Sequence, residues 1–171
     1  MPDLILSHIS FSNKYKSQAF INSLYLKDIK KIIELTEKEH IFLVFMKGIF
    51  YAADLYDDYN YRLTSDLDLL TIKEDLYRLD KCLRLIGYNY NGEGDLIKEA
   101  EIGHLKYIKP IGIFGNLLIE VHACISNPAK YYKQYTELVL EHSSYQELLS
   151  LKPRMESPQD RIIHSCLHFF A

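Results

Sequence analysis

The sequence lacks any apolar run that is long enough to cross a bilayer, and it lacks a recognisable signal segment. A membrane helix needs about 20 consecutive apolar residues, and no stretch of these 171 residues approaches that length. The opening "MPDLILSHIS" has neither a basic segment nor a long apolar core, so we expect no secretory signal peptide. The sequence therefore predicts a cytoplasmic protein with no membrane partner.

Cysteine is scarce, tryptophan is absent, and there is no excess of positive charge. The three cysteines, Cys82, Cys124 and Cys166, are an odd number, widely spaced and set in apolar stretches, which predicts buried free thiols in a reducing compartment. The net charge of −3 gives no basic field to attract nucleic acid. Nucleic acid is therefore the least favoured partner.

Low-complexity segments and internal repeats are also missing, and the hydrophobic share of 48% is that of a globular protein. Apolar periodicity predicts an alternation of helices and strands along the chain. The expected elements are a helix over 15–40, a buried strand over 41–48, a short helix over 49–56, a strand over 62–70, a helix over 73–87, a loop over 89–96, strands over 104–109 and 116–125 joined by a hairpin, and helices over 127–142, 144–151 and 157–171.

This order of elements predicts an α/β (α+β) domain with a mixed β-sheet flanked by helices. We divide it into an N-terminal helical segment (1–40), a core (41–126) and a C-terminal helical segment (127–171). In the last helix, Ser157 is the expected N-cap and Pro158 the first helical residue. Its expected apolar face consists of Ile162, Ile163, Cys166, Leu167 and Phe170. This face runs to the last residue without a capping residue, so we expect the segment to be truncated.

The stretch "RLTSDLDLL" places Asp66 and Asp68 inside an otherwise apolar strand. Side chains alternate along a strand, so both carboxylates are expected on one face, a few ångströms apart. Like charges that close favour protonation unless a cation lies between them. The pattern therefore indicates a divalent metal site, and the competing interpretation is a strand end whose acids meet solvent.

A third carboxylate, Glu120, lies in the apolar strand "NLLIEVHACI". Two-metal phosphoryl transfer needs about three converging carboxylates, and Asp66, Asp68 and Glu120 are the candidates. Glu120 shares a face with His122, which we interpret as a hydrogen-bonded strand histidine rather than a ligand. An edge strand would instead expose Glu120 to solvent.

Upstream, Lys47 and Gly48 stand at the junction between the first strand and the next helix. A glycine there lets a phosphate approach the amide hydrogens of the helix start, and Lys47 supplies a positive charge. His164 and His168 flank Cys166 on the last helix, where we favour packing over a zinc site. Asp57 and Asp58 are interpreted as loop acids.

Together, the strand ending in Lys-Gly, the Arg62 before Ser-Asp-x-Asp-Leu-Leu, the helix ending in Gly-Tyr and the later "IEVH" strand resemble the uncharacterised nucleotidyltransferase family of the DNA-polymerase-β-like superfamily. The direct resemblance covers 41–125, and "SPQDRIIHSCLH" is similar to a helix that follows in such proteins. One departure is that Ile49 follows Gly48, where the wider superfamily usually has Gly-Ser or Gly-Gly.

The resemblance implies a polymerase-β-like nucleotidyltransferase fold and transfer of a nucleoside monophosphate from an NTP, such as ATP, to an acceptor. Mg²⁺ or Mn²⁺ would be held by Asp66, Asp68 and Glu120, and Glu120 would help to activate the acceptor hydroxyl. The remaining implied contacts are Gly48 against the triphosphate, Lys47 and Arg62 on phosphate, and Ser65 orienting the aspartates. A small molecule or a protein hydroxyl is favoured as the acceptor.

Two other functions compete with this one. A non-catalytic relative would bind nucleotide or a protein partner, and Ile49 keeps that interpretation open. Metal-dependent glycosyltransferases also use Asp-x-Asp between apolar residues, although they normally need a longer nucleotide-binding half before the motif than the 65 residues present here. All three carboxylates facing one cleft would favour catalysis over binding.

Overall fold

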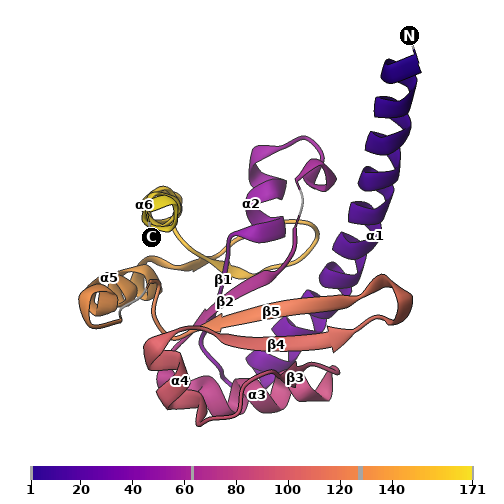
Figure 1. Ribbon diagram of the computed structural model, residues 1–171. Helices are drawn as coiled ribbons and strands as arrows, with labels where there is room; N and C mark the ends of the chain where they lie inside the picture. Colours follow the sequence, from indigo (N-terminus) through magenta and orange to yellow (C-terminus); the bar gives the residue numbers. More distant parts are fainter. Residues whose placement is uncertain (1, 63, 127–128, 171) are drawn as a thin grey trace.

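Seven strands form one mixed sheet in the order β3-β4-β5-β2-β1-β7-β6 (Figure 1). The computed structural model describes residues 2–62, 64–126 and 129–170, with backbone alone for residues 2–14, 129–131 and 168–170. The strands are β1 (Leu43–Met46), β2 (Leu67–Thr71), β3 (Asn89–Tyr90), β4 (Leu105–Pro110), β5 (Asn116–His122), β6 (Ser144–Tyr145) and β7 (Arg154–Met155). The mixed α+β sheet expected from the sequence is confirmed.

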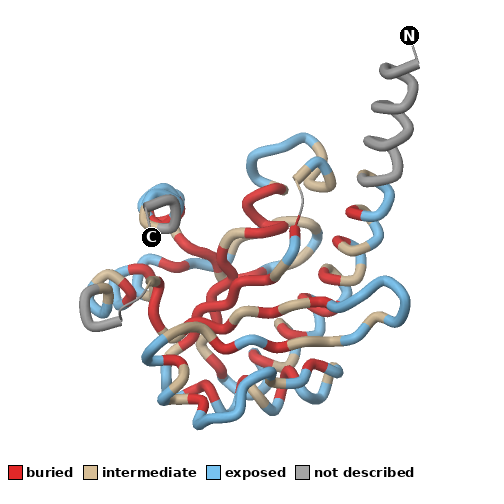
Figure 2. The backbone as a smooth tube through the Cα atoms, in the orientation of Figure 1, coloured by how far each residue is buried: buried red, intermediate tan, exposed pale blue. Residues whose placement is uncertain are grey.

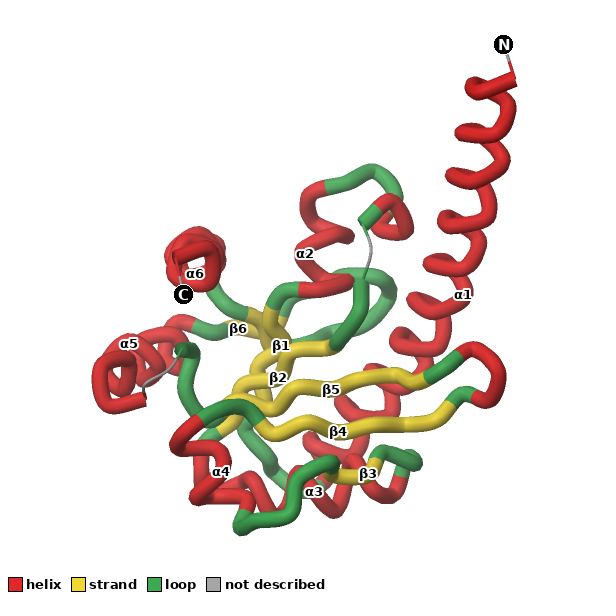
Figure 3. The backbone as a smooth tube through the Cα atoms, in the orientation of Figure 1, coloured by secondary structure: helices red, strands yellow, loops and turns green. Residues whose placement is uncertain are grey.

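Six α-helices surround this sheet, and Figure 3 shows how short most of the strands between them are. They are α1 (Pro2–Lys38), α2 (Gly48–Leu55), α3 (Leu76–Leu85), α4 (Leu96–Ile102), α5 (Ala129–His142) and α6 (Pro158–Phe170). At 37 residues, α1 is about 55 Å long, and its N-terminal half projects beyond the rest of the protein (Figure 1). None of the helices among the described residues combines the length and the apolar character that a membrane crossing requires.

Two clusters of buried residues pack on the sheet, and Figure 2 shows that buried residues concentrate along the central strands. On one face, Tyr25, Ile29 and Ile32 of α1 pack with Leu79 and Leu83 of α3 against the sheet. On the other face, Val44, Met46 and Leu70 form a smaller cluster with Ile125 and with Val139 of α5. This second face also carries Asp68 and Glu120, because residues 44, 46, 68, 70 and 120 share one side of the paired strands.

Several predicted elements are shorter than expected or different in kind. The strand predicted over 62–70 begins only at Leu67, so Asp66 stands in the loop before β2. The loop predicted over 89–96 contains β3 and leads into α4, whose start is capped by the Asp95 carboxylate accepting from the amides of Ile97 and Lys98. Apolar periodicity missed both because each element is very short.

The helix predicted over 144–151 is wrong. Residues Ser144–Tyr145 form β6, which pairs with β7, and β7 in turn pairs with β1 at the edge of the sheet. Between β6 and β7 the chain turns at Leu149 and Ser150, which both have positive φ angles. The apolar residues of "SYQELLSL" thus serve a tight turn and a strand rather than one helical stripe.

The helix α6 forms as predicted, and Ser157 caps it by accepting from the amide of Asp160 at 3.2 Å. Its predicted apolar face, however, is wrong. Ile162 and Ile163 are 67% and 46% exposed and Cys166 is exposed, whereas Arg161 and His164 are buried. Phe170 and His168 lie outside the described side chains. Cys82 and Cys124 are buried, as expected, so only the third thiol departs from its prediction.

This orientation predicts the thiol reactivity of the folded protein. We expect one cysteine, Cys166, to react rapidly with an aromatic disulfide reagent, and Cys82 and Cys124 to react only after denaturation, because reagent access requires exposure. The count of fast thiols should fall from one to none in Cys166→Ser. Rapid reaction of none or all three in the wild type would show that α6 packs differently.

Candidate active site

The two predicted carboxylate strands lie side by side. In the parallel pairing of β2 with β5, Asp68 is directly opposite Glu120, and Leu70 is opposite His122. Glu120 is in turn opposite Lys106 in β4, so β5 is an interior strand and not the edge strand that would have exposed Glu120. The structure therefore brings Asp68 and Glu120 together on one face of the sheet.

Asp68 is buried among positive and hydrogen-bonding groups. Its Oδ1 lies 3.1 Å from Nε2 of His122. Burial by itself disfavours the charged carboxylate, but the bond with His122 and the charge of Lys47 outweigh it, so the net pKa of Asp68 is lowered. Asp68 is thus ionised at neutral pH despite being only 6% exposed.

The pKa of Asp66 is shifted in the opposite direction to that of Asp68. Burial is the largest cause and the negative charge of Asp68 the next, and together they raise its pKa, with a further contribution from Glu120. The Ser65 hydroxyl donates to Oδ1 of Asp66 at 3.2 Å and, like Lys47, counteracts part of this effect. At Asp66, burial and the neighbouring negative charges therefore outweigh the effects of Ser65 and Lys47, and the charged form of this carboxylate is disfavoured.

The turn from β1 into α2 passes close to these carboxylates. Lys47 and Gly48 have positive φ angles of 44° and 55°, a conformation in which an L side chain is strained. A Cβ on Gly48 would lie 3.4 Å from the backbone oxygen of Asp66, an ordinary contact, so glycine is favoured here by its positive φ angle rather than by lack of space. The start of α2 and the loop before β2 thus lie against each other.

Beside this turn lies a residue that the sequence analysis missed. Thr64 is 6% exposed, and its hydroxyl is a buried polar group without a hydrogen-bond partner. Its methyl group would lie 3.7 Å from a Cβ on Gly48. An unpaired buried hydroxyl costs free energy, and such groups in native structures often await a ligand. Only the tertiary structure reveals this, because a threonine beside a strand is ordinary in sequence.

One tyrosine fixes the position of this loop. The Tyr25 hydroxyl on α1 lies 3.0 Å from the backbone oxygen of Ser65 and 3.2 Å from that of Leu118, and it accepts from the Leu118 amide. Burial raises the pKa of Tyr25 to about 12, so the hydroxyl keeps its proton. Tyr25 thereby ties the loop that carries Asp66 to β5.

The remaining predicted contact, Arg62, is not part of this cluster. Arg62 is the C-cap residue of the short 3₁₀ helix η1 (Tyr59–Tyr61). Within the described part of the chain, it makes no hydrogen bond or ion pair with the three carboxylates. Asp58, predicted as a loop acid, caps η1 by accepting from the amide of Asn60 and accepts from the Tyr15 hydroxyl.

Glu120 has basic partners of its own. Its Oε1 lies 3.2 Å from Nε2 of His104 and 3.6 Å from the Lys106 amine, and its side chain is 15% exposed. Burial lowers the pKa of His104, which favours a neutral imidazole. The sequence analysis missed His104 because the register between β4 and β5 decides which residue faces Glu120.

Behind the carboxylates, α6 contributes a buried ionic network. Glu156 is fully buried, its Oε1 lies 2.8 Å from Nδ1 of His164, and it accepts from the Tyr51 hydroxyl of α2. Arg161 bonds to Asp54 at 2.7 Å, which joins α6 to α2. The positive charge of His164 also helps to lower the pKa of Asp68. The packing role expected for His164 is what the structure shows.

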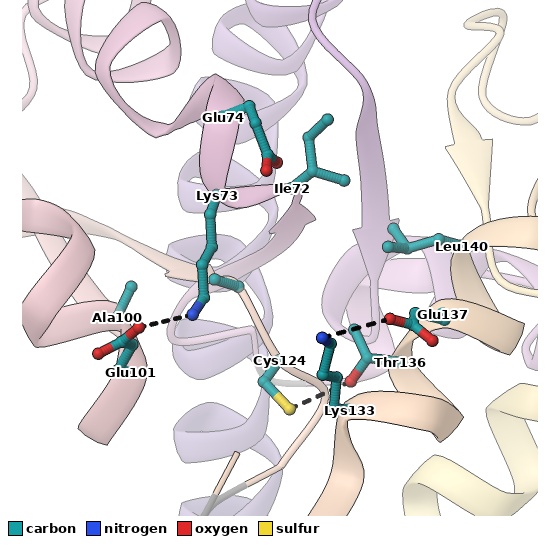
Figure 4. Close-up of a pocket in the computed structure, with 11 residues that line it drawn as sticks. Ile72, Lys73, Glu74, Ala100, Glu101, Cys124, Lys133, Thr136, Glu137 and Leu140 are labelled. Carbon is teal, nitrogen blue, oxygen red and sulfur yellow. Dashed lines mark hydrogen bonds and ion pairs between the residues drawn. The ribbon is translucent and has the colours of Figure 1, made fainter. Parts of the chain in front are cut away.

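A cavity of about 560 Å³ lies between α4, α5 and the carboxyl ends of β2 and β5 (Figure 4). Its walls carry the ion pairs Lys73–Glu101 and Lys133–Glu137. Ile72 of its lining follows Asp68 by four residues, about 13 Å along an extended strand. The cavity is therefore separate from the carboxylates.

The repulsion at Asp66 predicts a change in stability. In the metal-free protein, Asp66→Asn should raise the free energy of unfolding at pH 7 by roughly 0.5–1 kcal/mol, because it removes a charge that burial and Asp68 disfavour and that solvent only partly screens. A raised folded-state pKa means that Asp66 lowers stability as the pH rises, so the gain should vanish below the ordinary value of 3.8.

Urea unfolding at pH 7 and pH 3.5 measures this gain, with Asp57→Asn in the exposed loop after α2 as the control. A loss of stability in Asp66→Asn at pH 7 would mean that neighbouring groups stabilise the charged Asp66 carboxylate in the folded protein.

Comparison with known proteins identifies the family and the fold. A sequence profile described as uncharacterised nucleotidyltransferase matches residues 4–171. A proposed nucleotidyltransferase from Thermotoga maritima has a similar structure, with a TM-score of 0.54 and 12% identity over 86% of each chain. No curated protein matches the sequence.

Two further solved structures share the fold. The lincosamide antibiotic adenylyltransferase LnuA, solved with lincomycin bound, has a TM-score of 0.50 and 13% identity, with 80% of this chain and 83% of LnuA covered. The antibiotic-resistance factor ANT(2'')-Ia has a TM-score of 0.50 and 17% identity, with 82% of this chain and 69% of the other covered. At these identities the likeness establishes the fold alone. The profile spans nearly the whole sequence, and the chain therefore belongs to the uncharacterised nucleotidyltransferase family.

Proposed function

We propose that this protein is a metal-dependent nucleotidyltransferase that transfers a nucleoside monophosphate from an NTP to an acceptor hydroxyl. The observation that carries the proposal is the pairing of Asp68 with Glu120 on neighbouring parallel strands, with Asp66 immediately before one of them. A cluster of three carboxylates, of which Asp68 is buried and Asp66 and Glu120 are partly buried, is unfavourable unless cations balance it. The family assignment supports transfer and gives no support to the glycosyltransferase alternative.

The donor set fits Mg²⁺ or Mn²⁺. Asp66, Asp68 and Glu120 offer carboxylate oxygens, the ligands that these hard cations prefer, and burial followed by the charge of Asp68 raises the pKa of Asp66, an effect that a bound cation would counteract. We propose that these three residues hold the metal. When bound, it would neutralise the phosphates and polarise the bond that breaks.

The chain's own residues then bind and orient the NTP. We propose that the first amides of α2, which have no acceptor within the helix, donate to a phosphate, and that Lys47 adds a positive charge beside them. Ile49 is fully buried and contributes no hydroxyl. We propose that the unpaired hydroxyl of Thr64 supplies the missing donor next to Gly48.

At the other side of the cluster, Glu120 would accept the proton of the acceptor hydroxyl, with His104 and Lys106 holding its carboxylate in place. Arg62, which ends η1 in the loop before β2, and Ser65 remain proposed phosphate-contacting and positioning residues. LnuA is an adenylyltransferase, so ATP is the first nucleotide to test. We favour a small-molecule or protein hydroxyl as acceptor, because the net charge of −3 disfavours nucleic acid, and we place the reaction in the cytoplasm.

The proposed metal site predicts that nucleotide binding depends on a divalent metal ion. Calorimetry with ATP, GTP, CTP and UTP should show binding that requires Mg²⁺ or Mn²⁺ and that is lost in Asp66→Ala/Asp68→Ala, because the double variant removes the oxygen ligands. A control, Asp57→Ala/Asp58→Ala, removes two charges from the loop around η1. Metal-dependent binding without transfer to any hydroxyl acceptor would favour the non-catalytic relative, and the absence of binding would contradict the proposal.

The second prediction concerns Thr64. Thr64→Val should weaken ATP binding by about 10-fold or more, because a hydrogen bond to a charged phosphate is worth roughly 1.5–3 kcal/mol. Stability should be unchanged or slightly higher, since the hydroxyl has no partner in the free protein. Thr64→Ser is the matched control and should retain binding. Equal affinities of the valine and serine variants would remove Thr64 from the phosphate site.

A further inference from the structure

Two histidines converge on Glu120, which is one of the three acidic residues of the proposed reaction. Nitrogen or oxygen atoms of His104, Glu120 and His122 all lie within 4.8 Å of one another. The two imidazole rings have centroids 5.3 Å apart, and Nε2 of His104 is 3.2 Å from Oε1 of Glu120. Their arrangement differs in chemistry from the all-oxygen pair Asp66 and Asp68.

The sheet holds these three residues in place. Leu105 pairs with Val121 and Lys106 with Glu120 in the antiparallel β4–β5 ladder, so His104, one residue earlier, stands across from His122. Residues 104, 106, 120 and 122 therefore share one face of two adjacent strands. A site on paired strands keeps its geometry better than one on loops.

We propose that, while no nucleotide is bound, His104, Glu120 and His122 bind one transition-metal ion of the Zn²⁺ or Co²⁺ type, which shares Glu120 with the metal site of the proposed function and therefore competes with Mg²⁺ for this carboxylate. Two imidazoles and one carboxylate, with a fourth position left open, are a typical donor set for such ions, whereas Mg²⁺ prefers oxygen alone. Ligand atoms around a tetrahedral Zn²⁺ lie about 3.3 Å apart, so groups already within 4.8 Å need to close by only about 1–1.5 Å.

Two neighbours shape the affinity of this site. The ionised Asp68 accepts from Nε2 of His122 at 3.1 Å and thereby orients the ring, the role that a second carboxylate commonly has behind a ligating histidine. Lys106, whose amine is 3.6 Å from Glu120 and half exposed, competes with a metal for that carboxylate. Removing the lysine charge is therefore expected to strengthen metal binding.

The test uses Co²⁺ as a visible probe on the full chain after treatment with a chelator and without nucleotide. We expect the intense absorption of four-coordinate Co²⁺ to saturate at one ion per chain, to be displaced by Zn²⁺, and to persist in excess Mg²⁺. His104→Gln and His122→Gln should each weaken Co²⁺ binding by about 100-fold, and Asp68→Asn by about 10-fold. Lys106→Gln should tighten it by about 2- to 5-fold, the range of one exposed ion pair.

His142→Gln is the matched control, because His142 contacts Asp160 between α5 and α6 and should leave Co²⁺ binding unchanged. Thermal unfolding confirms that each variant folds, and His104, which is partly exposed, tolerates glutamine most easily. A weak six-coordinate spectrum, or an affinity unaffected by both histidine variants, would overturn the site. Because no nucleotide is present, this result is independent of ATP binding, so the site and the proposed function can fail separately.

Discussion

The crowding of negative charge on one face of the sheet is the constraint around which the rest of the structure is arranged. Asp66, Asp68 and Glu120 lie close enough that two of them raise the pKa of the third. Neighbouring elements bring groups that offset this repulsion: the turn into α2 brings Lys47, β5 brings His122, β4 brings Lys106, and α6 brings His164. The sheet is the frame that lets groups from these separate segments meet.

The alternating pattern of the two acidic strands could be predicted from sequence because a strand has a period of two. Asp68, Glu120 and His122 lie on the expected face, and burial of Leu117, Ile119 and Val121 on the other face follows from the same rule. His104 could not be predicted in this way. Its place opposite His122 depends on the register of β4 with β5, and that register is set by the turn between them. The role proposed for Thr64 could not be predicted either, because whether its hydroxyl has a hydrogen-bond partner depends on three-dimensional contacts.

The misassigned face of α6 shows where apolar periodicity fails. The pattern counts apolar side chains, and by that count Ile162, Ile163 and Cys166 belong inside. In the structure, Arg161 and His164 are buried instead, because Asp54 accepts from Arg161 and Glu156 bonds to His164, while the Tyr51 hydroxyl in turn donates to Glu156. A buried charge with complete partners can outweigh an apolar stripe, and the partners come from α2 and from the segment before α6, far away in sequence.

The parallel pairing of β2 with β5 also bears on how the protein folds. Asp68 and His122 are 54 residues apart, and everything from α3 to the β4–β5 hairpin lies between them. Closing so long a loop costs entropy before its contacts form, and such non-local pairings slow folding. We infer that the hairpin and the local helices form first and that the acidic cluster assembles only when β2 docks. Until then the carboxylates are separate and hydrated, so the electrostatic cost of the site falls on the last steps of folding.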